Sequence, residues 1–317
     1  MKLINLYYLN WIKSIMLNLE LKYAILIIAY NRPKHLEKLF QSLEDYCLLE
    51  SSQIVIVQQV GNIEVELLIS KFREKTKKCM VLAFDGSEKS LIANISFNRL
   101  EGYKFCFNIL NCDYVIALED DVVVGSDILY FTEFIMNKYW SKRNFRGINY
   151  GSHENYSDNT QGYFSQVRFG IQGPGSAIHR NTWKRLNTPR NILKSQYVLF
   201  DGVFEYFLKT GFMITPVNSR IMDNGHGGTH APIFSTDEHF VKLKNSFVNG
   251  FINHRLNYTL DKKSHSWRPD ALVYRFNQNW KYKILNFLNY RNDIYCFYKL
   301  ERAFYRLFIL GKLFKVK

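Results

Sequence analysis

The stretch Tyr23–Leu43 reads YAILIIAYNRPKHLEKLFQSL and contains two hydrophobic patterns in succession. Residues 23–30 form a continuous apolar run, which is typical of a strand buried on both faces. After Asn31 and Arg32, a proline at position 33 suits the first turn of a helix. Apolar residues then recur at helical spacing, at Leu36, Leu39, Phe40 and Leu43. The stretch therefore predicts a strand, a short turn and a helix.

Three further apolar runs continue this alternation, at residues 53–58, 80–84 and 114–118. Helical stretches are expected between them, over 65–72 and 92–110. Apolar strands that alternate with helices predict an α/β fold, with a Rossmann-like, mostly parallel sheet flanked by helices. Ligands of such sheets bind beyond the carboxyl ends of the strands, so the residues that follow each strand are candidates for function.

The later part of the chain has a looser pattern. We expect helices over 180–186 and 200–210 and a strand over 212–216. Residues 224–230 read NGHGGTH and predict a glycine-rich loop. His179 is interpreted as a structural or solvated residue, because a lone histidine is more often that than a ligand.

The composition indicates a large folded domain. The chain has 317 residues, of which 47% are hydrophobic, and this allows a sizeable core. Five cysteines without a C-x-x-C pair favour a reduced, cytoplasmic environment. No uncharged apolar run reaches about 18 residues, so a membrane-spanning helix is not expected. The net charge of +14 favours anionic partners, which include nucleotide phosphates, nucleic acid and anionic membranes.

An acidic triplet, Glu119-Asp120-Asp121, directly follows the apolar run at 114–118 and precedes three valines. Three acids after a strand can simply form a solvated turn. Here they lie between two apolar segments, and buried acids are costly without a partner. Hard divalent cations such as Mn²⁺ or Mg²⁺ prefer carboxylate oxygens. We therefore interpret the triplet as a metal site that binds a nucleotide-sugar diphosphate.

Three blocks of the sequence resemble the GT-A glycosyltransferases. They are Tyr23–Leu43, residues 115–131 (VIALEDDVVVGSDILYF) and residues 200–230 (FDGVFEYFLKTGFMITPVNSRIMDNGHGGTH). Within that fold they are most similar to the β-N-acetylglucosaminyltransferase I group, glycosyltransferase family 13, and its bacterial relatives. The resemblance covers roughly residues 22–240 and implies a GT-A domain there. An N-terminal segment, 1–21, and a basic amphipathic extension, 241–317, would flank it.

The resemblance implies roles for the residues at the ends of the first and fourth strands. Asp121 would be the direct ligand of Mn²⁺ or Mg²⁺. Glu119 and Asp120 would face the ribose or the sugar, or orient the waters of the metal. Arg32 would contact the nucleotide or its phosphates.

The resemblance also implies roles in the third block. Asp201 would be the general base that deprotonates the acceptor hydroxyl in an inverting transfer, although an Asp here also suits a helix N-cap. Thr229 would lie on the loop that closes over the diphosphate. His230 would complete the metal site or contact a phosphate. Gln59 stands in the region where the family has an acid that holds uracil, so the base is left open, with a UDP-sugar expected.

The expected function is an inverting, metal-dependent glycosyltransferase that moves a GlcNAc-type sugar to a saccharide or lipid-linked saccharide acceptor. It would act in bacterial surface glycan synthesis, of lipopolysaccharide or capsule. A nucleotidyltransferase is the first alternative, but it would need a glycine-rich phosphate loop, and residues 29–36 (AYNRPKHL) are not one. The second alternative is a basic nucleic-acid-binding protein, which the charge alone suggests. No nucleic-acid partner is expected, because the basic excess is concentrated near the C-terminus.

Residues 281–317 carry nine lysines and arginines against two acids, interleaved with Phe, Leu and Tyr. Such a segment can be a helix that packs on the domain with a solvated basic face. It can also be a helix that lies on an anionic membrane surface. We favour the membrane reading slightly, because a lipid-linked acceptor would require it. The expected location is then the cytoplasm, with peripheral contact at the inner face of the plasma membrane.

Overall fold

The computed structural model describes residues 21–46, 49, 51–86, 91–151, 164–167, 174–186, 212–216 and 219–225. All of them belong to the same compact unit of the chain. Several predictions concern residues outside this part. They are the segment 1–20, the helix over 200–210, Asp201, Thr229, His230 and the extension 241–317.

The first half of the described chain alternates strands and helices, as the sequence predicts. The elements are β1 Tyr23–Ala29, α2 Pro33–Tyr46, β2 Gln53–Gln59, α3 Ile63–Lys75, β3 Cys79–Phe84, α4 Leu91–Lys104, the π-helix η1 Phe105–Ile109 and β4 Tyr114–Glu119. Each predicted strand and helix in this half is present, and the expected helix over 92–110 is divided into α4 and the π-helical turn. Pro33 is the first residue of α2, where its missing N–H leaves no bond unmade.

The second half contains shorter elements. They are β5 Val122–Val124, α5 Ile128–Tyr139, β6 Phe145–Asn149, β7 Phe164–Val167, β8 Gly175–His179, α6 Arg180–Leu186, β9 Phe212–Pro216 and β10 Ile221–Asp223. The predicted helix over 180–186 and the predicted strand over 212–216 are confirmed. Among the described residues, no helix is long and apolar enough to cross a membrane.

Eight strands form one sheet in the order β3-β2-β1-β4-β8-β6-β9-β7. The strands β1 to β4 pair in parallel, and β8 joins the edge of β4 in the antiparallel direction. The strands β6 and β9 again run with β4, while β7 runs against β9. The strands β5 and β10 form a separate two-stranded sheet. The prediction of a mostly parallel α/β sheet is therefore confirmed.

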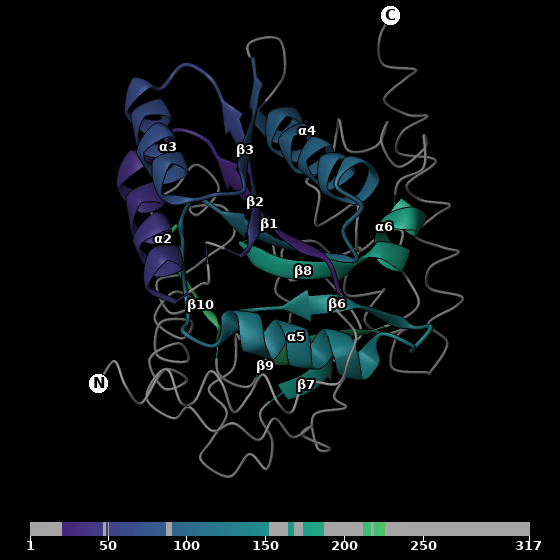
Figure 1. Ribbon diagram of the computed structural model, residues 1–317. Coiled ribbons are helices and arrows are strands. Elements are labelled where there is room, and N and C mark those ends of the chain that lie inside the picture. The colour runs from purple at the N-terminus through teal and green to yellow at the C-terminus, as the bar shows by residue number, and fades with distance from the viewer. Residues whose placement is uncertain are drawn as a thin grey trace, which may run out of the picture. The chain divides into compact units, whose positions relative to one another are not determined.

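The strands of the sheet are covered by helices on both faces, as Figure 1 shows for α2 and α3 on one side and α4 on the other. Successive residues of β1 point to opposite faces. Ile25 and Ile27 join a core with α2, α3 and α5, whereas Leu26 and Ile28 join a second core with α4, η1 and α6. This two-sided burial explains the unbroken apolar run of the strand.

The pairing of β1 with β4 places the residues that follow both strands at one edge of the sheet. In this parallel register Ile28 lies opposite Glu119. The turn between β1 and α2 therefore runs beside the acidic triplet.

His179, at the end of β8, is only 2% exposed, so the structure supports the structural rather than the solvated interpretation. Its ring lies 4.0 Å from the Trp140 ring, and its Nδ1 accepts a hydrogen bond of 2.9 Å from the Asn181 backbone N–H. Burial lowers the pKa of His179 to about 4, with Asp113 opposing and Arg146 reinforcing the shift.

His179 should therefore contribute stability that is lost in mild acid. The native state resists protonation of His179 while the unfolded chain takes up the proton, so stability is lost as the pH falls from about 6.5 towards 4. We expect this residue alone to reduce the free energy of unfolding by about 2 kcal/mol between pH 7 and pH 5. Urea unfolding of the wild type and of His179→Gln at both pH values measures this effect. An equal change in the free energy of unfolding between pH 7 and pH 5 in the two proteins would contradict this expectation.

Candidate functional site

The acidic triplet is held in place by strands on both of its sides. Glu119 ends β4, and its backbone N–H donates to the Pro174 carbonyl at 2.9 Å. After the triplet, β5 pairs with β10, which puts Asp223 opposite Val122. The Asn224 backbone N–H donates to the Asp121 carbonyl at 2.8 Å. The β5–β10 pair therefore brings a fourth acid, distant in sequence, beside the triplet.

Asp120 is tied to the turn that follows β1. One carboxylate oxygen accepts a hydrogen bond of 2.9 Å from the Tyr30 backbone N–H, and the other lies 2.6 Å from Arg32 Nη2. The residue is only 1% exposed. Burial raises the pKa of Asp120 to about 6, although the positive charge of Arg32 opposes the shift. Asp120 thus joins the two strand ends as a buried, charge-paired group.

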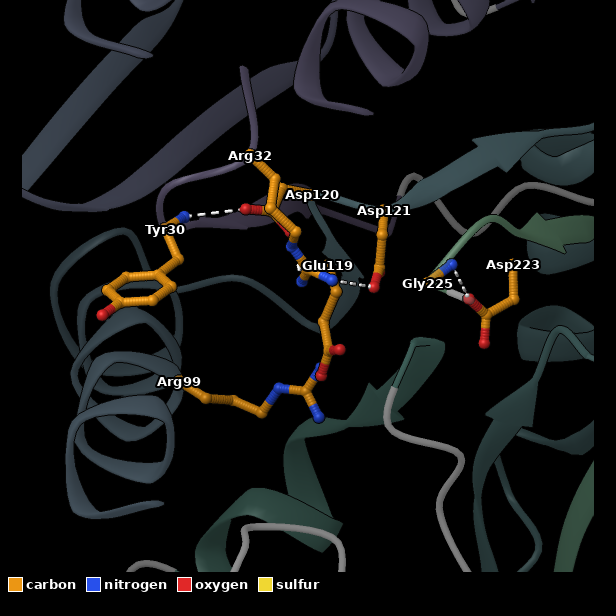
Figure 2. A network of polar contacts seen from close by, with 8 residues as sticks. All are labelled: Tyr30, Arg32, Arg99, Glu119, Asp120, Asp121, Asp223 and Gly225. Carbon is orange, nitrogen blue, oxygen red and sulfur yellow. Dashed lines mark hydrogen bonds and ion pairs between the residues drawn. The ribbon is translucent and has the colours of Figure 1, made fainter. Parts of the chain in front are cut away.

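Arg32 bridges two members of the triplet, as Figure 2 shows. Its Nη1 lies 2.5 Å from Asp121 Oδ2, in addition to the contact of Nη2 with Asp120. Burial by itself would lower the pKa of Arg32, but the attraction of the neighbouring carboxylates, Asp121 above all, outweighs it and the pKa is raised. Among the described residues, the Arg32 guanidinium is the positively charged group that contacts Asp120 and Asp121.

Glu119 makes a separate ion pair. Its Oε1 accepts from Arg99 Nη2 at 2.9 Å, and Figure 2 shows its side chain directed to Arg99 rather than to Asp121. Arg99 comes from α4 and its side chain is 3% exposed. Burial raises the pKa of Glu119 to about 7, with Arg99 opposing and Asp121 reinforcing the shift. Glu119, the first acid of the triplet, is therefore paired with Arg99.

Asp121 and Asp223 face one point beside Gly225. A Cβ added to Gly225 would lie 2.5 Å from Asp121 Oδ2 and 2.9 Å from Asp223 Oδ1. The Gly225 backbone N–H donates to Asp223 Oδ1 at 2.7 Å. Burial raises the pKa of Asp223 to about 6, and the charge of Asp121 adds to the shift. Any side chain larger than that of glycine at position 225 would therefore collide with both carboxylates.

The chemistry of the Asp121 and Asp223 carboxylates fits a hard divalent cation. Asp121 is 6% exposed, and its Oδ1 is buried with no hydrogen-bond partner within the described ranges. An unpaired, buried carboxylate oxygen is costly unless something binds it. The described residues contain no group of three His, Cys, Asp or Glu placed to hold a metal ion. Two carboxylates would thus leave positions for water and phosphate oxygens, as Mg²⁺ and Mn²⁺ sites often do.

The structure brings together the four described residues that the sequence selects, which are Arg32, Glu119, Asp120 and Asp121. Sequence reasoning missed Asp223, although its position just before the predicted glycine-rich loop was an available signal. It also missed Arg99, which lies within a predicted helix and carries no such signal.

Comparison with known proteins finds weak similarity to several solved structures. No protein-family model and no curated protein matches the chain. A mannosyltransferase from Pyrobaculum calidifontis, solved with GDP-Man and Mn²⁺, has a TM-score of 0.47 at 11% identity, covering 79% of this chain and 72% of that one. TarS from S. aureus has a TM-score of 0.43 at 11% identity, covering 81% and 78%. The galactosyltransferase LgtC, solved with donor and acceptor sugar analogues, has a TM-score of 0.38 at 14% identity, covering 61% of this chain and 73% of that one.

The substitution Gly225→Ala should impair cation binding. The added methyl group would collide with the Asp121 and Asp223 carboxylates and push Asp121 Oδ2 away. We expect Mn²⁺ affinity to fall by more than about tenfold, the usual result of displacing a ligand or its support. Titration of the protein with Mn²⁺, followed by the electron paramagnetic resonance of the free ion, measures this. Unchanged affinity in the variant would place the cation elsewhere.

Proposed function

We propose that the chain is a metal-dependent glycosyltransferase that takes a sugar from a nucleotide-sugar diphosphate. One observation carries the proposal. Asp121 and Asp223 both approach Gly225 closely at the carboxyl ends of parallel strands, and Asp121 there has a buried oxygen without a hydrogen-bond partner among the described residues. Ligands of α/β sheets bind at this edge. The resemblance of the sequence to the GT-A glycosyltransferases supports the same reading.

In this proposal Asp121 and Asp223 hold Mn²⁺ or Mg²⁺ together with the diphosphate of the donor. When bound, the cation neutralises the charge that develops on the departing nucleotide diphosphate. Asp120 fixes the turn after β1 through its bond to the Tyr30 backbone N–H. Glu119 keeps its ion pair with Arg99 and so shapes the wall of the site on the α4 side.

The remaining chemistry is assigned to residues outside the described ranges, and the sequence supports each assignment. Asp201 is proposed as the general base that removes the proton of the acceptor hydroxyl as the new bond forms, which inverts the anomeric carbon. Thr229 is proposed to contact the diphosphate from the glycine-rich loop. His230 is proposed as a further ligand of the cation or of a phosphate.

The substrates are proposed from the same resemblance. The donor is a UDP-sugar of GlcNAc type, as in glycosyltransferase family 13, and the acceptor is a saccharide or a lipid-linked saccharide. A role in lipopolysaccharide or capsule synthesis follows, at the cytoplasmic side of the membrane. The basic segment 281–317 is proposed to contact anionic lipid there.

The turn after β1 argues against a nucleotidyltransferase. Residues Asn31, Arg32 and Pro33 lead directly into α2, with the Leu36 backbone N–H bonded to the Arg32 carbonyl at 3.0 Å. No glycine-rich loop is present at this turn to wrap a triphosphate. The sheet edge is acidic around the triplet, which also disfavours a nucleic-acid backbone at this edge.

A panel of nucleotide sugars tests the proposal through the release of nucleoside diphosphate with and without Mn²⁺. We expect turnover that needs the cation and falls by at least about 100-fold in Asp121→Asn, because the charge of the leaving group is then poorly neutralised. Asp201→Asn should lose transfer to an acceptor but keep donor binding.

The matched control is Asp45→Asn, which removes an exposed carboxylate on α2. It should keep the activity of the wild type. Turnover that is independent of the cation, or equal in Asp121→Asn and Asp45→Asn, would contradict the proposed mechanism.

A further inference from the structure

We propose that Arg32 is a resident counter-cation of the acidic site, which must release Asp121 before a divalent cation can bind there. The inference rests on the proposed function, because it concerns the same cation and diphosphate. It assigns to Arg32 a role that precedes any contact with phosphate. Arg32 thereby couples the binding of the cation to the binding of the donor.

The first argument is that one carboxylate would contact two positive charges. Asp121 Oδ2 lies 2.5 Å from Arg32 Nη1, and Asp121 Oδ1 is buried without a hydrogen-bond partner among the described residues. A cation held between Asp121 and Asp223 would therefore lie on the same carboxylate as the guanidinium. Two positive charges on one carboxylate repel each other strongly, so the binding of the cation weakens the contact of Arg32.

The second argument comes from the distribution of charge. Four carboxylates interact here, and Arg99 is already paired with Glu119. Arg32 is then the group that neutralises Asp120 and Asp121 among the described residues. These two short contacts offset the charge of two buried acids that lie side by side. A divalent cation could take over this task for Asp121.

The third argument is that Arg32 is accessible to solvent, whereas the other arginine of the site is not. Its side chain is 30% exposed, whereas that of Arg99 is 3% exposed. It lies in the short turn between β1 and α2, just before the first residue of the helix. Asp120 would stay in place because the Tyr30 backbone N–H also holds it. Arg32 is therefore the more accessible of the two arginines, and Arg99 is the more enclosed one.

The release of Arg32 has a consequence for the donor. A free guanidinium beside a bound cation offers paired N–H donors, which suit the oxygens of a diphosphate. The diphosphate would then replace Asp121 as the ion-pair partner of Arg32. Binding of the cation and binding of the nucleoside diphosphate should each strengthen the other, and this coupling should depend on Arg32.

The test is a Mn²⁺ titration of the full chain, followed by the electron paramagnetic resonance of the free ion, with and without UDP. In Arg32→Met we expect Mn²⁺ alone to bind at least about tenfold more tightly than in the wild type, because a competing charge is gone. UDP should tighten Mn²⁺ binding in the wild type and do so less in the variant. Arg32→Gln, which keeps a polar side chain, provides a second variant should Arg32→Met fold poorly.

Two controls locate the effect. Lys34→Met removes the same charge from an exposed position two residues away, and it should change Mn²⁺ affinity by less than about twofold because water screens it. Asp121→Asn combined with Arg32→Met should abolish the gain. Both results would support exchange at Asp121.

Equal Mn²⁺ affinity in the wild type and Arg32→Met, or an equal gain in Lys34→Met, would overturn the inference. Either result leaves the proposed function standing if nucleotide-sugar turnover still requires the cation and Asp121. No Mn²⁺ binding in any of these proteins, with or without UDP, would overturn the inference as well. Turnover without a cation would instead remove the proposed mechanism itself.

Discussion

The structure of the site depends on one constraint, which is that buried carboxylates must be paired. Asp120 and Asp121 are 1% and 6% exposed and lie side by side at the end of β4. Arg32 offsets their charge, and the Tyr30 backbone N–H adds a bond to Asp120. The turn between β1 and α2 is consequently fixed against the triplet. The parallel pairing of β1 with β4 makes this contact possible, because it brings both strand ends to one edge.

The elements of the first half could be predicted because each strand is a short apolar run and α2 carries its apolar residues at helical spacing. Leu36 and Leu39 of α2, for example, are fully buried where the helical spacing places them. The strand β8 could not be predicted in the same way. It is a five-residue strand that runs antiparallel between β4 and β6, so its place depends on contacts with distant segments rather than on its own pattern.

The same difference explains the prediction of the site. The acidic triplet was visible because its three acids are adjacent and lie between apolar runs. Asp223 was not selected, because only the pairing of β5 with β10 brings it to Asp121, about a hundred residues away along the chain. The role of Gly225 likewise depends on a close approach that a sequence does not show. The place of Arg32 after β1 indicates it in the sequence, and the structure shows that its guanidinium pairs with Asp120 and Asp121.

The central claim is that Asp121 and Asp223 bind a divalent cation together with a nucleoside diphosphate. Crystals of the full chain grown with Mn²⁺ and UDP test it directly, through anomalous diffraction at the manganese edge. The account predicts a manganese peak within about 2.2 Å of a carboxylate oxygen of Asp121, next to Gly225, with Arg32 moved away from Asp121. A peak at another place, or UDP bound with Arg32 still paired to Asp121 and no manganese beside it, would contradict the account.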